Sequence, residues 1–257
     1  MLATVRHQLH ARSAALLLSI ESGLPRIMTW WLGLAIAASA LRIATSPLQG
    51  TMPDLATIMP YVLLTCAPLV SMGLALKWFA GGDRFAQPSV RLARVGRWTE
   101  VSPAEARRHK LYGTTGFMVS LLLGMLLNVP VRAAEYLAAM PALSGPVPQW
   151  LGALNFMLTL DVVLLSSLYV VTFVAALRRV PLFPRLLLAV WAIDLLMQSS
   201  IATIVMASPD VPSAVSTSLH NVLEGNVKKV LISVALWLPY LMLSRRVNVT
   251  FRSRVPA

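Results

Sequence analysis

The sequence predicts an all-α fold, a polytopic transmembrane bundle of about six spanning helices. Of the 257 residues, 57% are hydrophobic and only 12% are charged, and the mean hydropathy is +0.70. A soluble domain usually carries roughly 25% charged residues. A single soluble core of this size cannot bury so much apolar surface. The apolar residues also gather in long blocks, and the basic residues lie between these blocks.

Each apolar block approaches the length of about 20 residues that a helix needs to cross a bilayer. In chain order the six predicted spans are 29–44, 58–79, 113–131, 151–177, 186–207 and 230–243. Four prolines, Pro60, Pro68, Pro130 and Pro239, lie within or at the end of three of them. Transmembrane helices tolerate proline because neighbouring groups satisfy the freed carbonyls, so we interpret these prolines as kinks.

The chain ahead of the first span differs from the rest. Residues 1–28 begin with basic residues, but their apolar centre is short and interrupted by charge, which is not typical of a cleavable signal. We expect a cytoplasmic N-terminal segment, with an interfacial helix that turns Leu16, Leu17 and Ile20 towards the lipid. Residues 29–257 are predicted to form one transmembrane domain.

The distribution of charge predicts the orientation in the membrane. A net charge of +12 would suggest nucleic acid in a soluble chain, but here most of the 22 basic residues lie in alternate connections: 1–28, the loop 81–112, the turn 178–185 and the tail after 243. The positive-inside rule then predicts cytoplasmic N- and C-termini in a bacterial inner membrane, and no nucleic-acid partner. Anionic lipid headgroups are the expected partners of the basic anchors. These anchors are Arg107, Arg108, Lys110, Arg178, Arg179, Arg245 and Arg246.

Two carboxylates lie inside predicted spans. Asp161 lies near the middle of the fourth span and Asp194 near the middle of the fifth, one turn before Gln198. Ionisable groups at membrane depth are costly, which makes them functional candidates. Counting about 1.5 Å per residue from the connecting turn, their depths differ by about 10 Å, so they are expected to share a polar cavity and not to pair directly. Either they handle a proton or cation, or they fix packing by bonding Ser166, Ser199, Gln198 or an arginine.

Three further polar features lie near predicted span ends. Arg132 and Glu135 are spaced i, i+3, and we expect them to form an ion pair at the outer interface. Arg42 is expected to reach the same interface by snorkelling. Glu224 and Lys228 are spaced i, i+4 and predict a surface pair on a helix that leads into the last span.

The sequence gives little support for catalysis. Cys66 is the only cysteine, so the chain contains no intrachain disulfide and no cysteine-rich metal site. Motifs of serine hydrolases, zinc proteases, nucleotide-binding loops and dinucleotide-binding folds are absent from the sequence. An intramembrane hydrolase built from Ser166, Ser167 and Asp161 would lack a recognisable base. We therefore predict a protein that is not an enzyme and that holds no cofactor or metal.

The end of the chain, "LWLPYLMLSRRVNVTF", resembles the YdgK-like family of small bacterial inner-membrane proteins. The resemblance covers about residues 111–251 and implies an inner-membrane helical fold, but no activity, because the function of that family is unknown. The matching residues in the most specific part are Trp237, Pro239, Tyr240, Ser244, Arg246, Val247, Thr250 and Phe251.

Two functional hypotheses follow from these patterns. The first is a non-enzymatic accessory or assembly factor of the cell envelope, which needs only packed interfaces. The second is a small proton- or cation-coupled transporter that uses Asp161 and Asp194, which needs a hydrated pocket that reaches both carboxylates. The sequence does not indicate a substrate.

Overall fold

The computed structural model describes residues 2–47, 53–91 and 96–257, with the side chains of residues 2–10 left out. Its fold is all-α, as predicted, and six of the described helices are long and apolar enough to cross a membrane. The long helices are α1 (Leu2–Ala44), α2 (Leu55–Trp78), α4 (Phe117–Ala139), α5 (Gln149–Leu177), α6 (Phe183–Met206) and α7 (Ser213–Leu243). The shorter elements are η1 (Gly82–Arg84), β1 (Trp98–Glu100), α3 (Pro103–Arg108), α8 (Arg245–Arg252) and β2 (Arg254–Pro256).

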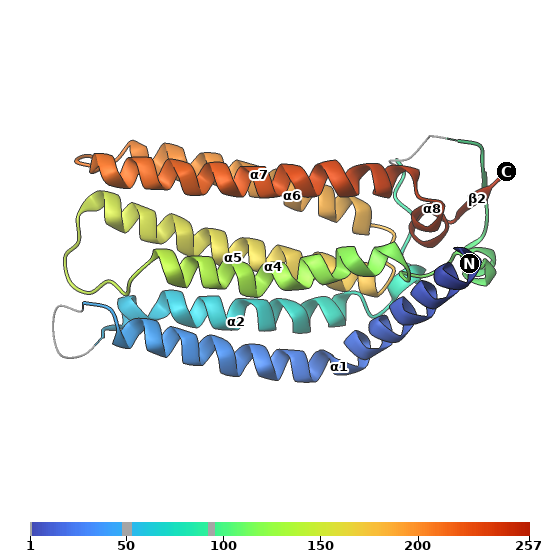
Figure 1. Ribbon diagram of the computed structural model, residues 1–257, viewed down its shortest axis with the longest axis horizontal. Coiled ribbons are helices and arrows are strands. Elements are labelled where there is room, and N and C mark those ends of the chain that lie inside the picture. The colour runs from blue at the N-terminus through green and yellow to red at the C-terminus, as the bar shows by residue number, and fades with distance from the viewer. Residues whose placement is uncertain (1, 48–52, 92–95) are drawn as a thin grey trace.

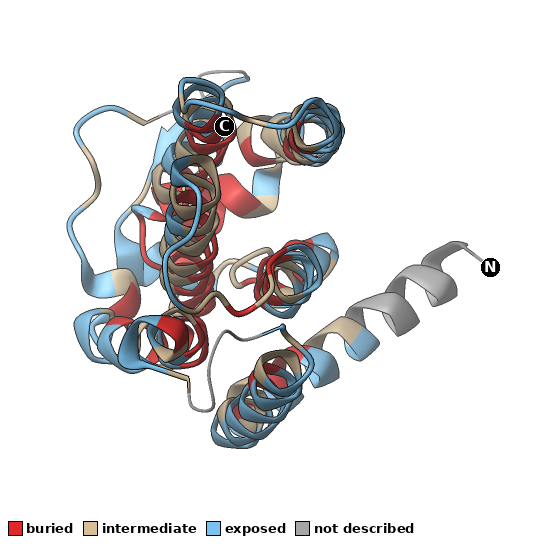
Figure 2. Cartoon of the chain, turned by 90° about the vertical axis from the view of Figure 1, so that its left-hand side faces the viewer, coloured by how far each residue is buried: buried red, intermediate tan, exposed pale blue. Residues whose placement is uncertain are grey.

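The long helices run side by side along one axis (Figure 1). Helix α5 is the centre of the bundle, since it packs against α2, α4 and α6, and its last residues, 172–177, are all buried. Helix α1 packs against α2 and α4, and α7 packs against α6. Buried residues therefore gather in the middle of the end view, and the outer helices are mostly exposed (Figure 2). Such apolar outer faces are what a lipid environment requires.

Three helices extend beyond their predicted spans. Helix α4 continues through Pro130 to Ala139, because a proline in a packed apolar helix kinks it without ending it. Helix α7 begins at Ser213, so the segment predicted to lead into the last span is part of the same helix, and its end at Leu243 is the predicted one. The boundary predicted at residue 28 falls inside α1, which contains Pro25 and changes direction along its length (Figure 1).

The side chains of the N-terminal segment differ from the prediction in part. Leu17 and Ile20 are buried against the bundle and do not face lipid, whereas Leu16 is exposed. The reason is the continuity of α1, which carries these residues back onto the bundle core instead of along the membrane surface.

The last residues of the chain fold back onto the bundle. Ser244 ends α7 and caps α8, and the Phe251 ring packs against that of Phe183, with 4.9 Å between ring centroids. Thr250 Oγ1 accepts a hydrogen bond from the Gly113 backbone N–H (3.0 Å). Strand β2 then pairs antiparallel with β1 from the loop 81–112, of which residues 92–95 lie outside the described part. The basic tail is thus an ordered cover over one end of the helices.

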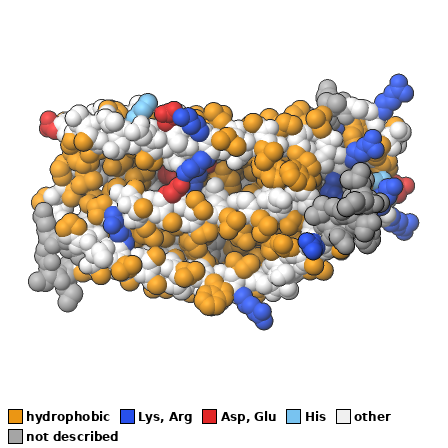
Figure 3. Space-filling view, viewed as in Figure 1, with side chains coloured by type: hydrophobic (Ala, Val, Ile, Leu, Met, Phe, Trp, Pro, Cys, Tyr) orange, Lys and Arg blue, Asp and Glu red, His pale blue; other side chains and the backbone are white. Residues whose placement is uncertain are grey.

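The two ends of the described chain lie at the same end of the bundle, together with α3, α8 and β2 (Figure 1). Several Lys and Arg side chains stand out at this end of the molecule (Figure 3). An even number of spans requires this arrangement. The assignment of this end to the cytoplasm stays a prediction.

Candidate functional site

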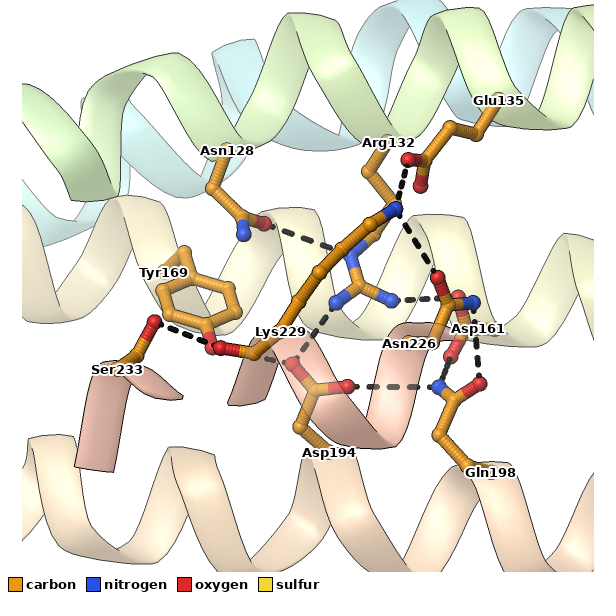
Figure 4. A network of polar contacts seen from close by, with 10 residues as sticks. All are labelled: Asn128, Arg132, Glu135, Asp161, Tyr169, Asp194, Gln198, Asn226, Lys229 and Ser233. Atoms are coloured by element: carbon orange, nitrogen blue, oxygen red, sulfur yellow. Dashed lines mark hydrogen bonds and ion pairs between the residues drawn. The ribbon is translucent and has the colours of Figure 1, made fainter. Parts of the chain in front are cut away.

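A single arginine joins the two intramembrane aspartates (Figure 4). Arg132 of α4 donates from Nη1 to Asp161 Oδ2 on α5 (2.7 Å) and from Nη2 to Asp194 Oδ2 on α6 (2.8 Å). The side chains are 11%, 10% and 1% exposed, respectively. The planar guanidinium presents donors in a fixed fork, which suits it to hold two carboxylates at once. Arg132 therefore fixes the relative positions of three helices.

Two neutral side chains complete the contacts of the carboxylates. Gln198 Nε2 donates to Asp161 Oδ1 (3.1 Å) and lies 3.4 Å from Asp194 Oδ1, and the Tyr169 hydroxyl donates to Asp194 Oδ2 (3.0 Å). Gln198 is 2% exposed. Buried polar groups need such partners because an unmet donor or acceptor costs about 1–3 kcal/mol. We call Arg132, Asp161, Tyr169, Asp194 and Gln198 the charge cluster.

The charge cluster continues through α7 to the surface of the bundle (Figure 4). Asn226 Nδ2 donates to Gln198 Oε1 (3.2 Å), and its Oδ1 accepts from Lys229 Nζ (3.3 Å). Lys229 also pairs with Glu135 of α4, and these two side chains are 62% and 45% exposed. A chain of polar contacts thus links the buried carboxylates to an exposed ion pair.

The predicted pair of Arg132 with Glu135 is wrong. Arg132 pairs with Asp161 and Asp194, and Glu135 pairs with Lys229. Because α4 does not end at Pro130, Arg132 lies within the helix and not beyond it at the interface. Two carboxylates in a medium of low dielectric constant attract the guanidinium more strongly than one carboxylate that water partly screens.

Side chains from α4 and α6 bridge the difference in depth that the sequence predicts between Asp161 and Asp194. Asp161 and Asp194 share one guanidinium and one amide. Gln198 lies one turn beyond Asp194, which brings its amide to the level of Asp161, and the long Arg132 side chain covers the remaining difference in depth. Counting residues along two helices missed the reach of side chains from α4 and α6.

A cavity of about 560 Å³ lies between α6 and α7 and ends at the charge cluster. Gln198 belongs to its wall, so one amide contacts both the cavity and the two carboxylates. The polar part of the wall consists of Gln198, Ser199, Ser216, Thr217, His220 and Glu224, and apolar side chains make up the remainder. A volume of this size suits a small molecule.

The half of the bundle towards the termini is densely packed next to the charge cluster. Phe173, Phe183 and Leu187 are fully buried between the charge cluster and the end that carries the termini. The cavity lies in the other half, because its wall comes from the second half of α6 and the first half of α7. The cavity thus contacts the charge cluster from the half of the bundle away from the termini.

The remaining predicted residues are found as follows. Glu224 and Lys228 form the predicted i, i+4 pair. Arg42 donates to the Met140 carbonyl (2.9 Å). Among the anchors, Arg107 pairs with Asp83, and Arg246 donates to Thr115 Oγ1 (2.8 Å). The other anchors lie at or just after the end of α3 (Arg108, Lys110), directly after α5 (Arg178, Arg179) and at the start of α8 (Arg245).

Four participants were not identified from the sequence: Asn128, which accepts from Arg132 Nε (3.4 Å), and Tyr169, Asn226 and Lys229. Tyr169 lies two helical turns after Asp161, which places both on one face of α5, and this spacing was a usable signal. Asn226 and Lys229 are spaced i, i+3 in the helix predicted to lead into the last span, which is part of α7. That signal was hidden because the segment was not expected to belong to a spanning helix.

Comparisons with protein-family models, with curated proteins and with solved structures each find no match to this chain. The resemblance to the YdgK-like family therefore stays a prediction. The function has to be argued from the site alone.

Proposed function

We propose that this protein is a small proton-coupled transporter of a membrane, with Asp161 and Asp194 as its proton-binding groups. Gln198 carries this proposal, because it bonds both carboxylates and forms part of the wall of the 560 Å³ cavity. A solute that bonds Gln198 from the cavity competes with the carboxylates for the same amide. Solute binding and carboxylate charge are then linked through one side chain, and such linkage is reciprocal.

The count of charges favours a proton or a small cation as the coupling ion. One guanidinium faces two carboxylates, which leaves one negative charge when both carboxylates are ionised. The neighbouring Lys229 is itself paired with Glu135 and does not remove the excess. An unpaired charge in a medium of low dielectric constant is costly, so the cluster gains free energy by taking up one positive charge.

The position of the cavity, in the half of the bundle away from the termini, fits a state of a transporter that is open on that side. Alternating access requires a central site that is reached from each side in turn. In this arrangement α6 and α7 would move relative to α4 and α5. The contacts that must change are those between the two pairs of helices, the Arg132–Asp194 and Lys229–Glu135 ion pairs. With the predicted orientation, the open side is the outside of the cell.

The accessory-factor hypothesis and the absence of enzymatic activity remain predictions. A scaffold needs neither a buried excess charge nor a cavity that ends on it, so the transporter explains more of the site. Replacing a buried ion cluster by apolar residues often raises stability, which means that the cluster needs a reason other than stability.

The test is charge movement after a pH jump. The full chain is reconstituted in vesicles on a solid-supported membrane, and the displaced charge is recorded when the external pH is lowered. We expect a signal in the wild type and its loss in Asp161→Asn and in Asp194→Asn. Asp210→Asn is the matched control, because Asp210 is an exposed carboxylate of the α6–α7 turn. Its left-handed backbone (φ 56°) suits asparagine equally well.

A sodium jump at constant pH separates the possible ions. A signal with sodium alone would replace the proton by a cation and keep the carboxylates as its site. Equal signals in the wild type and in folded Asp161→Asn and Asp194→Asn would refute the proposal. Silence of the wild type in both jumps would refute it as well and would favour a packing role.

A further inference from the structure

A second, smaller cavity lies at the end of the bundle that carries the termini. It measures about 290 Å³, and its wall is formed by the ends of α2 and α5, by η1 and by α1. Three arginines line it: Arg84, Arg178 and Arg179. Because these residues lie where spanning helices end, the cavity is at the depth of lipid headgroups.

Two of the arginines that line the cavity, Arg178 and Arg179, are not fully bonded within the described structure. The Nε atoms of Arg178 and Arg179 are buried and have no hydrogen-bond partner among the described residues. Arg178 makes only a long contact to Glu21 (3.8 Å), and Arg179 stacks over the Tyr112 ring at 5.7 Å from its centroid. A buried charged donor without an acceptor is costly, so an anion bound among these arginines would gain favourable contacts.

The acidic residues of the cavity do not supply that anion. Asp83 is already engaged, since Arg107 Nε donates to it at 2.7 Å and the Tyr112 hydroxyl donates to it as well. Burial and the hydrogen bond to Asp83 raise the pKa of Tyr112 to about 12, so the hydroxyl keeps its proton at neutral pH. Glu21 is the one remaining carboxylate against three guanidinium groups.

The backbone holds the arginines in this arrangement. Gly82 has φ +55°, and a Cβ atom there would lie 2.7 Å from the Arg178 carbonyl oxygen. Only glycine permits η1 to approach the α5–α6 turn so closely. Arg179, with φ 60°, occupies the left-handed region at that turn. The three arginines thus come from two segments that are packed together and not from a loose surface.

We propose that this cavity, which we call the arginine pocket, binds the phosphate group of an anionic ligand. Guanidinium groups bind phosphate with paired, charge-assisted hydrogen bonds, and three of them line this one cavity. Such a phosphate belongs to an anionic phospholipid of the inner leaflet or to a soluble phosphate ester. The depth of the pocket favours the lipid. This binding does not depend on the proposed transport activity.

Native mass spectrometry of the full chain in detergent tests the lipid. We expect the wild type to retain phosphatidylglycerol over phosphatidylcholine, and Arg178→Gln/Arg179→Gln to bind it about tenfold more weakly, since loss of one charge-assisted pair corresponds to about this factor. Arg245→Gln is the matched control, because Arg245 is an exposed arginine of the same end that does not line the pocket.

Two further variants guard against a folding defect. Arg84 is exposed, so Arg84→Gln should fold normally and still weaken retention severalfold. Glu21→Gln removes the competing carboxylate and should strengthen retention, an effect opposite in sign to any loss of structure. Thermal unfolding in the same detergent checks that each variant is folded.

Isothermal titration with inorganic phosphate and with glycerol 3-phosphate separates the two sources. Retention of phosphatidylglycerol that depends on the pocket, without binding of the soluble phosphates, assigns the pocket to lipid. Binding of a soluble phosphate that the same variants weaken, without preference between the lipids, assigns it to a soluble ester. If folded Arg178→Gln/Arg179→Gln and Arg84→Gln match the wild type towards every probe, the pocket is not a phosphate site.

Discussion

The charges of two buried arginines in this protein are compensated in different ways. Arg132, inside the bundle, faces two carboxylates at 2.7 Å and 2.8 Å. Arg252, in the C-terminal helix α8, is 3% exposed and has no carboxylate partner among the described residues. Its Nη1 donates to the Leu241 carbonyl (3.0 Å) and to Asn248 Oδ1 (3.2 Å), while Nη2 has no partner in the described structure.

The difference teaches what each arginine contributes. Burial lowers the pKa of Arg252, because only neutral dipoles oppose the loss of hydration. Leu241 lies in the last turn of α7, where free carbonyls carry partial negative charge. Arg252 therefore links the folded-back C-terminal segment to the end of that helix. Arg132, by contrast, is outnumbered by its counter-charges. Its removal would leave buried anions unpaired, whereas removal of Arg252 would leave none.

The largest effect is expected for Arg132→Met. This change leaves Asp161 and Asp194 buried without a counter-charge, and breaking a buried ion pair in this way costs about 3–5 kcal/mol. We expect the free energy of unfolding in detergent, measured by denaturant titration, to fall by this amount.

The control for Arg132→Met is the same change combined with Asp161→Asn and Asp194→Asn. Neutral amides of equal size should recover much of the lost stability, since the unpaired charges are gone. If the combined variant is as unstable as Arg132→Met alone, the loss comes from packing and not from charge.

A much smaller effect is expected for Arg252→Met. The change removes hydrogen bonds to Leu241 and Asn248, but it also removes a buried charge with an unused donor. We expect the free energy of unfolding to fall by about 1–2 kcal/mol, because the buried oxygen of Asn248 loses its donor while the unused donor of Arg252 is removed as well. A loss as large as that of Arg132→Met would contradict the contrast between the two arginines.

The smallest effect is expected for an ion pair on the surface of a helix. Glu224 and Lys228 are 50% and 66% exposed, and i, i+4 pairs of this kind contribute about 0.2–0.5 kcal/mol. Glu224→Gln should therefore change the melting temperature only slightly, and less at high salt. A destabilisation comparable to that of Arg132→Met would show that exposure does not separate structural from peripheral charges in this bundle.

The sequence predicts several residues of the candidate site, but it does not predict which of them contact one another. Asp161, Asp194 and Gln198 stand out in the sequence because polar residues are costly inside apolar runs. Their partner Arg132 was assigned to Glu135, since sequence spacing reports neighbours on one helix and not those on adjacent helices. Tyr169 and Asn226 are ordinary residues until the packing of α5 and α7 brings them to the charge cluster.

What the sequence by itself determined is the all-α class, the number of spans and the end of the last span at Leu243, because hydropathy and length depend on composition along the chain. Only the tertiary structure decided that α1 is continuous, that the basic tail folds back as α8 and β2, and that one arginine joins two aspartates. These features depend on side chains that are distant in sequence and meet across helices. Their free energy comes from burial and pairing in three dimensions, which no local pattern encodes.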